Sequence, residues 1–175
     1  MNNYPDTNNI KIYDNFFTYK IQTEIIKLLD RPKWSFCAGS PDQRFWGMDN
    51  LEQEEYFSDF LFKILCKKIE KNFKIKRIYA NGQTAGQSGT PHKDDGDWTF
   101  LYYPNSQWNT NDNGSLFFLE KIKSTGISEV IHTVSYKPNR GVLFPAKIYH
   151  YADAPNIRYK GLRISLAFKM IEIDS

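Results

Sequence analysis

The sequence predicts an α+β protein in which two N-terminal helices support a β-sandwich or barrel. Before residue 73, apolar residues recur at three- and four-residue intervals in two segments, which is the spacing of amphipathic helices. From about residue 74 onward, short aromatic and β-branched runs alternate with segments rich in Gly, Asn and Pro. Many closely spaced strands after two helices are typical of an α+β domain with a sandwich or barrel core.

The first expected helix covers residues 18–29, with Thr18 as its N-cap and Pro32 beyond its end. The second is expected over residues 53–72. The expected strands are the runs IKRIYA, WTFLYY, SLFFL, EVIHTV, GVLFP and LRISLAFKMIEI. The expected turn-rich connections are NGQTAGQSGTP, PNSQWNTNDNG, KPNRG and ADAPN. We find no internal repeat and expect a single domain over 1–175, with helical support over about 1–73 and a barrel core over about 74–172.

Composition excludes several classes of function. The net charge of +3 is too small to indicate a nucleic-acid or membrane partner, and the basic residues between positions 63 and 77 mostly follow the spacing of a solvated helix face. Cys37 and Cys66 are the only cysteines, which suits a reducing compartment better than a disulfide framework. The sequence contains no apolar run of signal-peptide or membrane-span length. We therefore expect a cytoplasmic protein with no nucleic-acid and no membrane partner.

Two histidines and one aspartate are candidate metal ligands. On an extended strand, residues two apart point to the same face, so His92 and Asp94 of the HKD segment can face one ion while Asp95 points away. His150 follows the strand-like run GVLFPAKIYH and is the expected third ligand. Two histidines and one carboxylate on one face of an octahedral ion leave three adjacent positions open, as in non-haem Fe(II) oxygenases. The alternative is that all three are ordinary turn and rim residues.

A cation inside an apolar strand is a further candidate. Arg163 lies in the run GLRISL and shares a strand face with Ser165, an arrangement suited to bidentate capture of a carboxylate. Arg158 is the competing candidate, in a turn-like segment, and a salt bridge at the barrel rim is the alternative role for Arg163. His132 lies in the strand EVIHTV without a local partner and is expected to be structural.

Residues 79–170 resemble the 2-oxoglutarate and Fe(II)-dependent oxygenase superfamily, in particular its prolyl 4-hydroxylase-like branch. The resemblance runs through YANGQTAGQSGTPHKDDGDWTFLYYPNSQW, NDNGSLFFLE, PNRGVLFPAKIYHYADAP and GLRISLAFKM. It implies a double-stranded β-helix, or jelly roll, with N-terminal supporting helices. It carries over His92, Asp94 and His150 as the iron ligands.

The resemblance also implies a site for a co-substrate. Arg163 would hold the C5 carboxylate of 2-oxoglutarate, with Ser165 and one or more of Tyr79, Thr99 and Tyr103 completing the pocket. Tyrosines in strands are commonly ordinary core residues, which is the alternative role for each of the two tyrosines.

The activity that the resemblance implies is that of a dioxygenase, an oxidoreductase that couples decarboxylation of 2-oxoglutarate to substrate hydroxylation. Its cofactors would be Fe(II), 2-oxoglutarate and dioxygen, with ascorbate (vitamin C) as an optional addition. The leading expectation is a prolyl 4-hydroxylase-like enzyme acting on a peptide or protein. The alternatives are a hydroxylase of a free small molecule and a non-catalytic jelly-roll binding module. The chain departs from the family pattern at residues 113–115, where Asn-Gly-Ser replaces the frequent Gly-Gly pair, and at Pro104, where many relatives carry Leu.

Overall fold

The computed structural model of the chain describes residues 7–38, 44–121 and 128–173. The strands are β1 (Lys11–Tyr13), β2 (Ser35–Ala38), β3 (Phe45–Met48), β4 (Phe73–Gln83), β5 (Trp98–Tyr103), β6 (Leu116–Lys121), β7 (Ser128–Val134), β8 (Arg140–Pro145), β9 (Tyr149–Ala152) and β10 (Arg163–Glu172). The helices are α1 (Tyr19–Leu29) and α2 (Phe62–Ile69), with short helical segments η1 (Thr7–Asn9), η2 (Leu51–Gln53), η3 (Tyr56–Leu61) and η4 (Thr110–Asp112).

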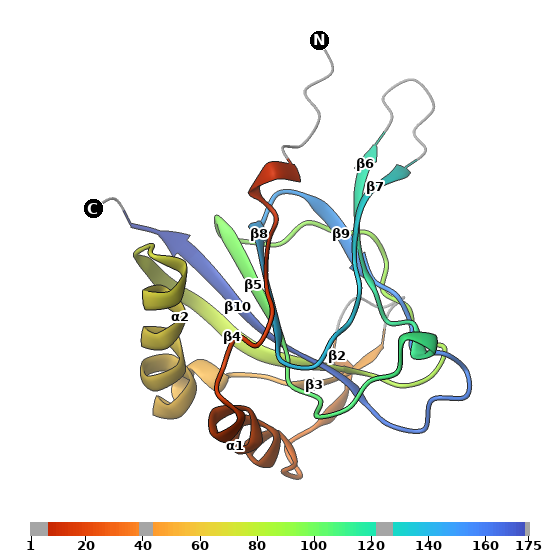
Figure 1. The fold of residues 1–175 in the computed structure, drawn as a ribbon, viewed down its shortest axis with the longest axis horizontal. Helices are drawn as coiled ribbons and strands as arrows, with labels where there is room; N and C mark the ends of the chain where they lie inside the picture. Colours follow the sequence, from red (N-terminus) through yellow and green to blue (C-terminus); the bar gives the residue numbers. More distant parts are fainter. Residues whose placement is uncertain (1–6, 39–43, 122–127, 174–175) are drawn as a thin grey trace.

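The strands form two antiparallel sheets that face each other, with both helices outside the larger sheet (Figure 1). The larger sheet has the order β1-β8-β5-β10-β4-β3-β2, and the smaller has the order β7-β6-β9. This arrangement confirms the predicted double-stranded β-helix. All six predicted strands are present, and β10 lies in the middle of the larger sheet, paired with β4 on one side and β5 on the other.

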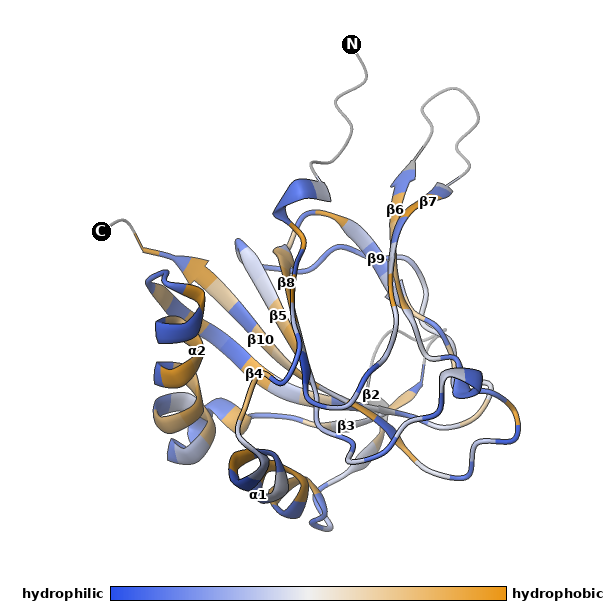
Figure 2. Ribbon diagram, viewed as in Figure 1, coloured by the Kyte–Doolittle hydropathy of each residue, from blue (hydrophilic) through white to orange (hydrophobic). Residues whose placement is uncertain are grey.

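The two helices form close to where they are expected. Thr18 caps α1 through its hydroxyl, which accepts a hydrogen bond from the Ile21 N–H at 3.4 Å. The second predicted helix divides into the π-helical η3 and the α-helical α2, and it ends at Glu70 in the left-handed conformation. Both helices carry hydrophilic and hydrophobic positions on different faces (Figure 2).

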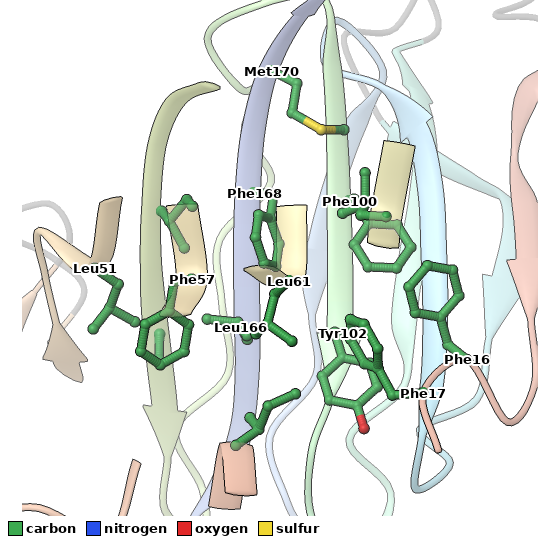
Figure 3. Packing of buried hydrophobic residues seen from close by; sticks show 14 of the residues in the cluster. Phe16, Phe17, Leu51, Phe57, Leu61, Phe100, Tyr102, Leu166, Phe168 and Met170 are labelled. Atoms are coloured by element: carbon green, nitrogen blue, oxygen red, sulfur yellow. The ribbon is translucent and has the colours of Figure 1, made fainter. Parts of the chain in front are cut away.

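Two apolar clusters fill the space on either side of the larger sheet. The first lies between the helices and the outer sheet face (Figure 3) and includes Ile25, Leu29, Phe57, Leu61, Phe100, Leu166, Phe168 and Met170. The second lies between the two sheets and includes Tyr103, Phe118, Tyr136, Phe144 and Ala167. Alternation along β10 therefore sends its even-numbered side chains toward the helices and its odd-numbered side chains into the barrel.

Several strands were not expected from the sequence. β1, β2 and β3 come from the first 73 residues and extend the larger sheet at both edges, so this part of the chain supplies strands as well as supporting helices. β9 was also missed, although it contains His150. Within the described ranges, no helix is long and apolar enough to cross a membrane. Residues 1–6, where no signal peptide is expected, lie outside the described residues.

Candidate metal centre

Backbone pairing between two distant segments brings His92 and His150 together. His150 lies in β9, and an antiparallel bridge joins it to His92, with each N–H donating to the other residue's carbonyl at 3.0 Å. Two residues further on, the Asp94 N–H donates to the Ala146 carbonyl at 2.8 Å. The segment before β5 thus continues the smaller sheet beyond β9. This pairing places the His-x-Asp segment opposite the third predicted ligand.

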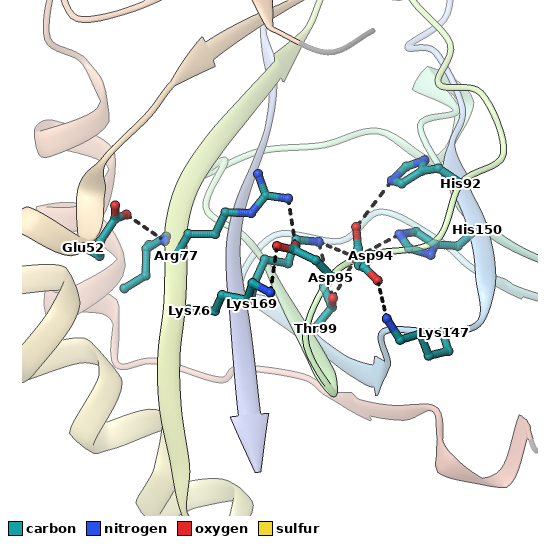
Figure 4. Close-up of polar contacts among 11 residues, drawn as sticks. Glu52, Lys76, Arg77, His92, Asp94, Asp95, Thr99, Lys147, His150 and Lys169 are labelled. Carbon is teal, nitrogen blue, oxygen red and sulfur yellow. Dashed lines mark hydrogen bonds and ion pairs between the residues drawn. The ribbon is translucent and has the colours of Figure 1, made fainter.

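The side chains of the three residues converge on one point (Figure 4). The Asp94 Oδ1 atom lies 3.6 Å from His92 Nε2, and its Oδ2 atom lies 3.2 Å from His150 Nε2. Their candidate ligand atoms all lie within 4.8 Å of one another. Nitrogen and oxygen ligands at right angles around one ion, each about 2.1 Å from it, are about 3 Å apart. The spacing therefore fits one metal ion held by all three residues.

Hydrogen bonds to the far side of each imidazole identify which nitrogen is free. His92 Nδ1 lies 2.8 Å from the Thr90 carbonyl oxygen, and His150 Nδ1 lies 2.9 Å from that of Ile148. Because a carbonyl oxygen only accepts, each Nδ1 carries a hydrogen, and the neutral form of each imidazole therefore carries its lone pair on Nε2. In that form both lone pairs face the Asp94 carboxylate, an arrangement that is favourable when a cation lies among them.

The charge states of the ligands also suit a metal. Burial by itself would raise the pKa of Asp94, but the contacts with His150 and Lys169 outweigh it and hold the pKa well below the ordinary value. Partial burial and the adjacent His150 lower the pKa of His92. At neutral pH the centre therefore presents an ionised carboxylate and a neutral His92 imidazole, the forms that bind metal ions.

Asp94 has two further partners in the barrel. The Thr99 hydroxyl donates to Asp94 Oδ2 at 2.7 Å, and the Lys169 ammonium donates to the same oxygen. Thr99 was expected in the co-substrate pocket, and the structure places it on this carboxylate. Lys169 was not singled out from the sequence. It belongs to the same alternating set as Arg163 and Ser165, and that alternation was a signal for it.

Other predicted residues lie around this centre. Asp95 points away from the triad, as expected, and accepts a hydrogen bond from Arg77 at 2.9 Å. Tyr79 is half-buried, with the Arg77 guanidinium carbon 4.9 Å and Lys169 Nζ 5.6 Å from its ring centre, so it lies near the metal end of the barrel. His132 lies on β7 outside the triad, with its ring 6.0 Å from that of Phe118.

Arg163 is fully enclosed in the barrel, with 1% of its surface exposed. Its Nε donates to the Gly114 carbonyl at 2.8 Å, and its Nη1 donates to Gln83 Oε1 at 2.7 Å. The guanidinium carbon lies 5.4 Å from the ring centre of Tyr103 and 4.7 Å from that of Tyr136. Within residues 7–38, 44–121 and 128–173, no carboxylate forms an ion pair with this guanidinium.

Two buried hydrogen-bond donors near Arg163 have no partner. Across the described part of the chain, Arg163 Nη2 and Tyr103 Oη are the buried side-chain atoms without one. Burial raises the pKa of Tyr103, opposed by the charge of the neighbouring Arg163, so the hydroxyl stays protonated. Leaving buried donors unpaired is unfavourable, and a carboxylate would satisfy both. Ser165 is buried on the same strand face, whereas Arg158 is exposed.

The close approach of Gly114 to Arg163 leads to a stability prediction. Gly114 has a φ of +76°, and a Cβ there would lie 2.9 Å from Arg163 Nε and 2.9 Å from the Trp108 ring. Gly86 has a φ of +77°, but its Cβ would meet only Ile157 Cδ1, at 4.0 Å. Gly114→Ala and Gly86→Ala thus share the backbone strain, of about 1–2 kcal/mol, and differ in crowding.

We expect Gly114→Ala to lower the free energy of unfolding by at least about 1 kcal/mol more than Gly86→Ala does, because overpacking adds to the strain. Urea unfolding followed by circular dichroism measures both. Equal losses of unfolding free energy in the two variants would show that Arg163 and Trp108 can move to accommodate the added methyl group.

Comparison with known proteins identifies the fold. Neither a protein-family model nor a curated protein sequence matches the chain. Among solved structures, the chain is similar to a prolyl hydroxylase from Trichoplax adhaerens in complex with a hypoxia inducible factor peptide fragment (TM-score 0.66, 18% identity, 95% of this chain and 84% of that one).

Two further structures have similar folds. One is the viral collagen prolyl hydroxylase of Paramecium Bursaria Chlorella virus-1, in its 2-oxoglutarate complex (TM-score 0.67, 11% identity, 94% of this chain and 97% of that one). The other is HygX from Streptomyces hygroscopicus, with nickel and 2-oxoglutarate bound (TM-score 0.69, 11% identity, 91% and 81%). At these identities the likeness shows a shared jelly-roll fold.

Proposed function

We propose that the protein is a 2-oxoglutarate- and Fe(II)-dependent dioxygenase that hydroxylates its substrate. The observation that carries the proposal is the presence of two complementary sites in the same barrel. One is a triad of His92, Asp94 and His150 in metal-binding form, and the other is a buried Arg163 with a donor left over for a carboxylate. In this proposal, the helical support and the barrel form one domain over residues 1–175.

Each site has a defined task in this proposal. Bound Fe(II) and 2-oxoglutarate supply the oxidising chemistry, in which decarboxylation of the co-substrate is coupled to hydroxylation. His92, Asp94 and His150 would hold the ion, and three protein ligands would leave room for the co-substrate and dioxygen on it. Arg163 Nη2 and Tyr103 Oη fix the far carboxylate of 2-oxoglutarate, with Ser165 beside them.

We propose further that the substrate is a peptide or protein and that proline is the target residue. The His92 side chain is 49% exposed, so the centre opens to solvent on that side. Next to His150, the exposed ring of Tyr149 has Lys93 Nζ 4.7 Å from its centre. An exposed aromatic ring can pack against an extended, proline-containing chain, and two similar structures are prolyl hydroxylases.

Hydroxylation of a free small molecule is the second candidate. HygX and the epimerase SnoN, from nogalamycin biosynthesis, share the fold of this chain, and SnoN has a structure with nogalamycin RO. The triad and the Arg163 pocket serve either substrate class equally, because both classes use the same co-substrate.

The deciding experiment supplies the Fe(II)-loaded protein with 2-oxoglutarate, ascorbate and either proline-rich peptides or free proline. We expect succinate formation that depends on the peptide, together with a peptide mass gain of one oxygen atom. The measurement is mass spectrometry of the peptide alongside quantification of succinate, with Mn(II) in place of Fe(II) as the inactive control. Oxidation of free proline alone, or stimulation only by a metabolite, would favour the small-molecule candidate. No succinate under any condition would leave a binding module.

A further inference from the structure

We propose that Lys169 is a built-in cation that makes metal binding depend on the co-substrate. In this role its ammonium weakens the binding of a divalent ion alone and strengthens the binding of 2-oxoglutarate to the ion-loaded centre. The proposal rests on the proposed function, since it requires a metal ion at the triad and an anionic co-substrate beside it.

The contacts of Lys169 are those of a charge built into the site. The residue is 1% exposed and lies in an apolar run of β10, where an unpaired ammonium would be costly. Its Nζ donates to Asp94 Oδ2 and lies 3.3 Å from Thr99 Oγ1 (Figure 4). The same atom lies 5.6 Å from the ring centre of Tyr79. β10 is paired on both sides at this position, with Lys169 opposite Arg77 of β4 and Thr99 of β5, and the register with β4 shifts directly after it.

The two oxygens of Asp94 have different surroundings. Oδ2 accepts hydrogen bonds from both Lys169 and Thr99 and lies 3.2 Å from His150 Nε2, whereas Oδ1 lies 3.6 Å from His92 Nε2. Among the described residues Oδ1 accepts no hydrogen bond from an ammonium or a hydroxyl, so it can bind a metal ion while Oδ2 keeps its two donors. Lys169 can thus remain in place when the ion binds, on the opposite oxygen of the same carboxylate.

The ammonium of Lys169 changes the net charge of the metal-loaded centre. A divalent ion, one carboxylate and one ammonium leave two positive charges at the centre, and without the ammonium one remains. Like charges this close in a buried site repel strongly, so Lys169 lowers the affinity for the ion. The same excess charge attracts an anionic co-substrate. By thermodynamic linkage, 2-oxoglutarate then strengthens metal binding by the same factor as the metal strengthens binding of 2-oxoglutarate.

The test measures Mn(II) binding to the full chain by electron paramagnetic resonance, with and without 2-oxoglutarate. In Lys169→Met, which keeps all but the terminal atom of the side-chain length and removes the charge, we expect Mn(II) alone to bind about tenfold more tightly, or about 1.4 kcal/mol. We also expect the strengthening of Mn(II) binding by 2-oxoglutarate to fall about tenfold. Lys169→Arg keeps the charge and should retain the coupling.

The matched control is Lys147→Met. Lys147 also approaches Asp94, with Nζ 3.5 Å from its backbone oxygen, but it is exposed. Solvent screening should limit the change in Mn(II) affinity to less than about threefold.

Each outcome bears on the proposal. A Lys169→Met protein that folds only with Mn(II), judged by circular dichroism, would support it, because the ion then replaces the ammonium as the partner of Asp94. Unchanged or weaker Mn(II) affinity, or unchanged coupling, would overturn it while leaving the metal centre in place. Loss of folding with and without Mn(II) would also overturn it, by assigning Lys169 to the fold. Absence of Mn(II) binding in the unaltered protein would overturn the proposed function as well.

Discussion

His150→Ala is expected to abolish metal binding and turnover together. The substitution removes one of three protein ligands and leaves His92 and Asp94, which hold an ion poorly by themselves. Loss of an outer hydrogen-bond partner of a ligand costs roughly 10- to 100-fold in affinity, so loss of the ligand itself should cost more than about 100-fold. Mn(II) binding and succinate formation measure the two effects separately.

His132→Ala is the control for this substitution. It removes the same side chain from β7, outside the triad, and should leave metal affinity and turnover close to those of the unaltered protein. Near-normal Mn(II) affinity in His150→Ala would refute the assignment of the triad.

Arg163→Met is expected to raise the KM for 2-oxoglutarate by about 100-fold or more while leaving Mn(II) affinity within about threefold. Breaking a buried charge pair costs about 3 kcal/mol or more, which corresponds to a factor of this size. The variant retains Asp94 and both histidines, so its affinity for Mn(II) should stay close to that of the unaltered protein. Initial rates of succinate formation at varied 2-oxoglutarate concentration measure the KM.

Two further variants serve as controls for Arg163→Met. Arg163→Lys keeps the charge but loses the guanidinium fork that contacts Gly114 and Gln83. Its KM for 2-oxoglutarate should therefore lie between those of the unaltered protein and Arg163→Met. Arg158→Met removes an exposed arginine and should leave the KM unchanged. If Arg158→Met raised the KM and Arg163→Met did not, the carboxylate site would lie elsewhere.

The chemistry-bearing residues were largely predictable because they follow strand alternation. His92 and Asp94 share one face by spacing, whereas their meeting with His150 depends on a backbone bridge to β9, a strand that was not predicted. Lys169 was not predicted because its partner, Asp94, lies 75 residues away in the sequence and meets it only through the fold. The neighbours that enclose Arg163, such as Gln83, come from pairing between strands far apart in sequence, which local spacing does not specify.

In the secondary structure, too, the elements set by local sequence were predicted and those set by pairing of distant segments were not. Long runs such as WTFLYY carry their own β preference and were predicted, whereas KIY in β1 and YHYA in β9 are too short to do so. β1 forms by pairing with the edge of β8, and β9 forms by pairing with β6. The π-helical η3 also departs from the regular helix that its apolar spacing predicts.

The unequal exposure of the three candidate metal ligands has a kinetic consequence. The His92 side chain is 49% exposed, whereas those of Asp94 and His150 are 3% and 4% exposed. Water and small chelators therefore reach a bound ion along the His92 flank. We therefore expect an ion at this centre to leave from the His92 side and to exchange with free metal ions in solution.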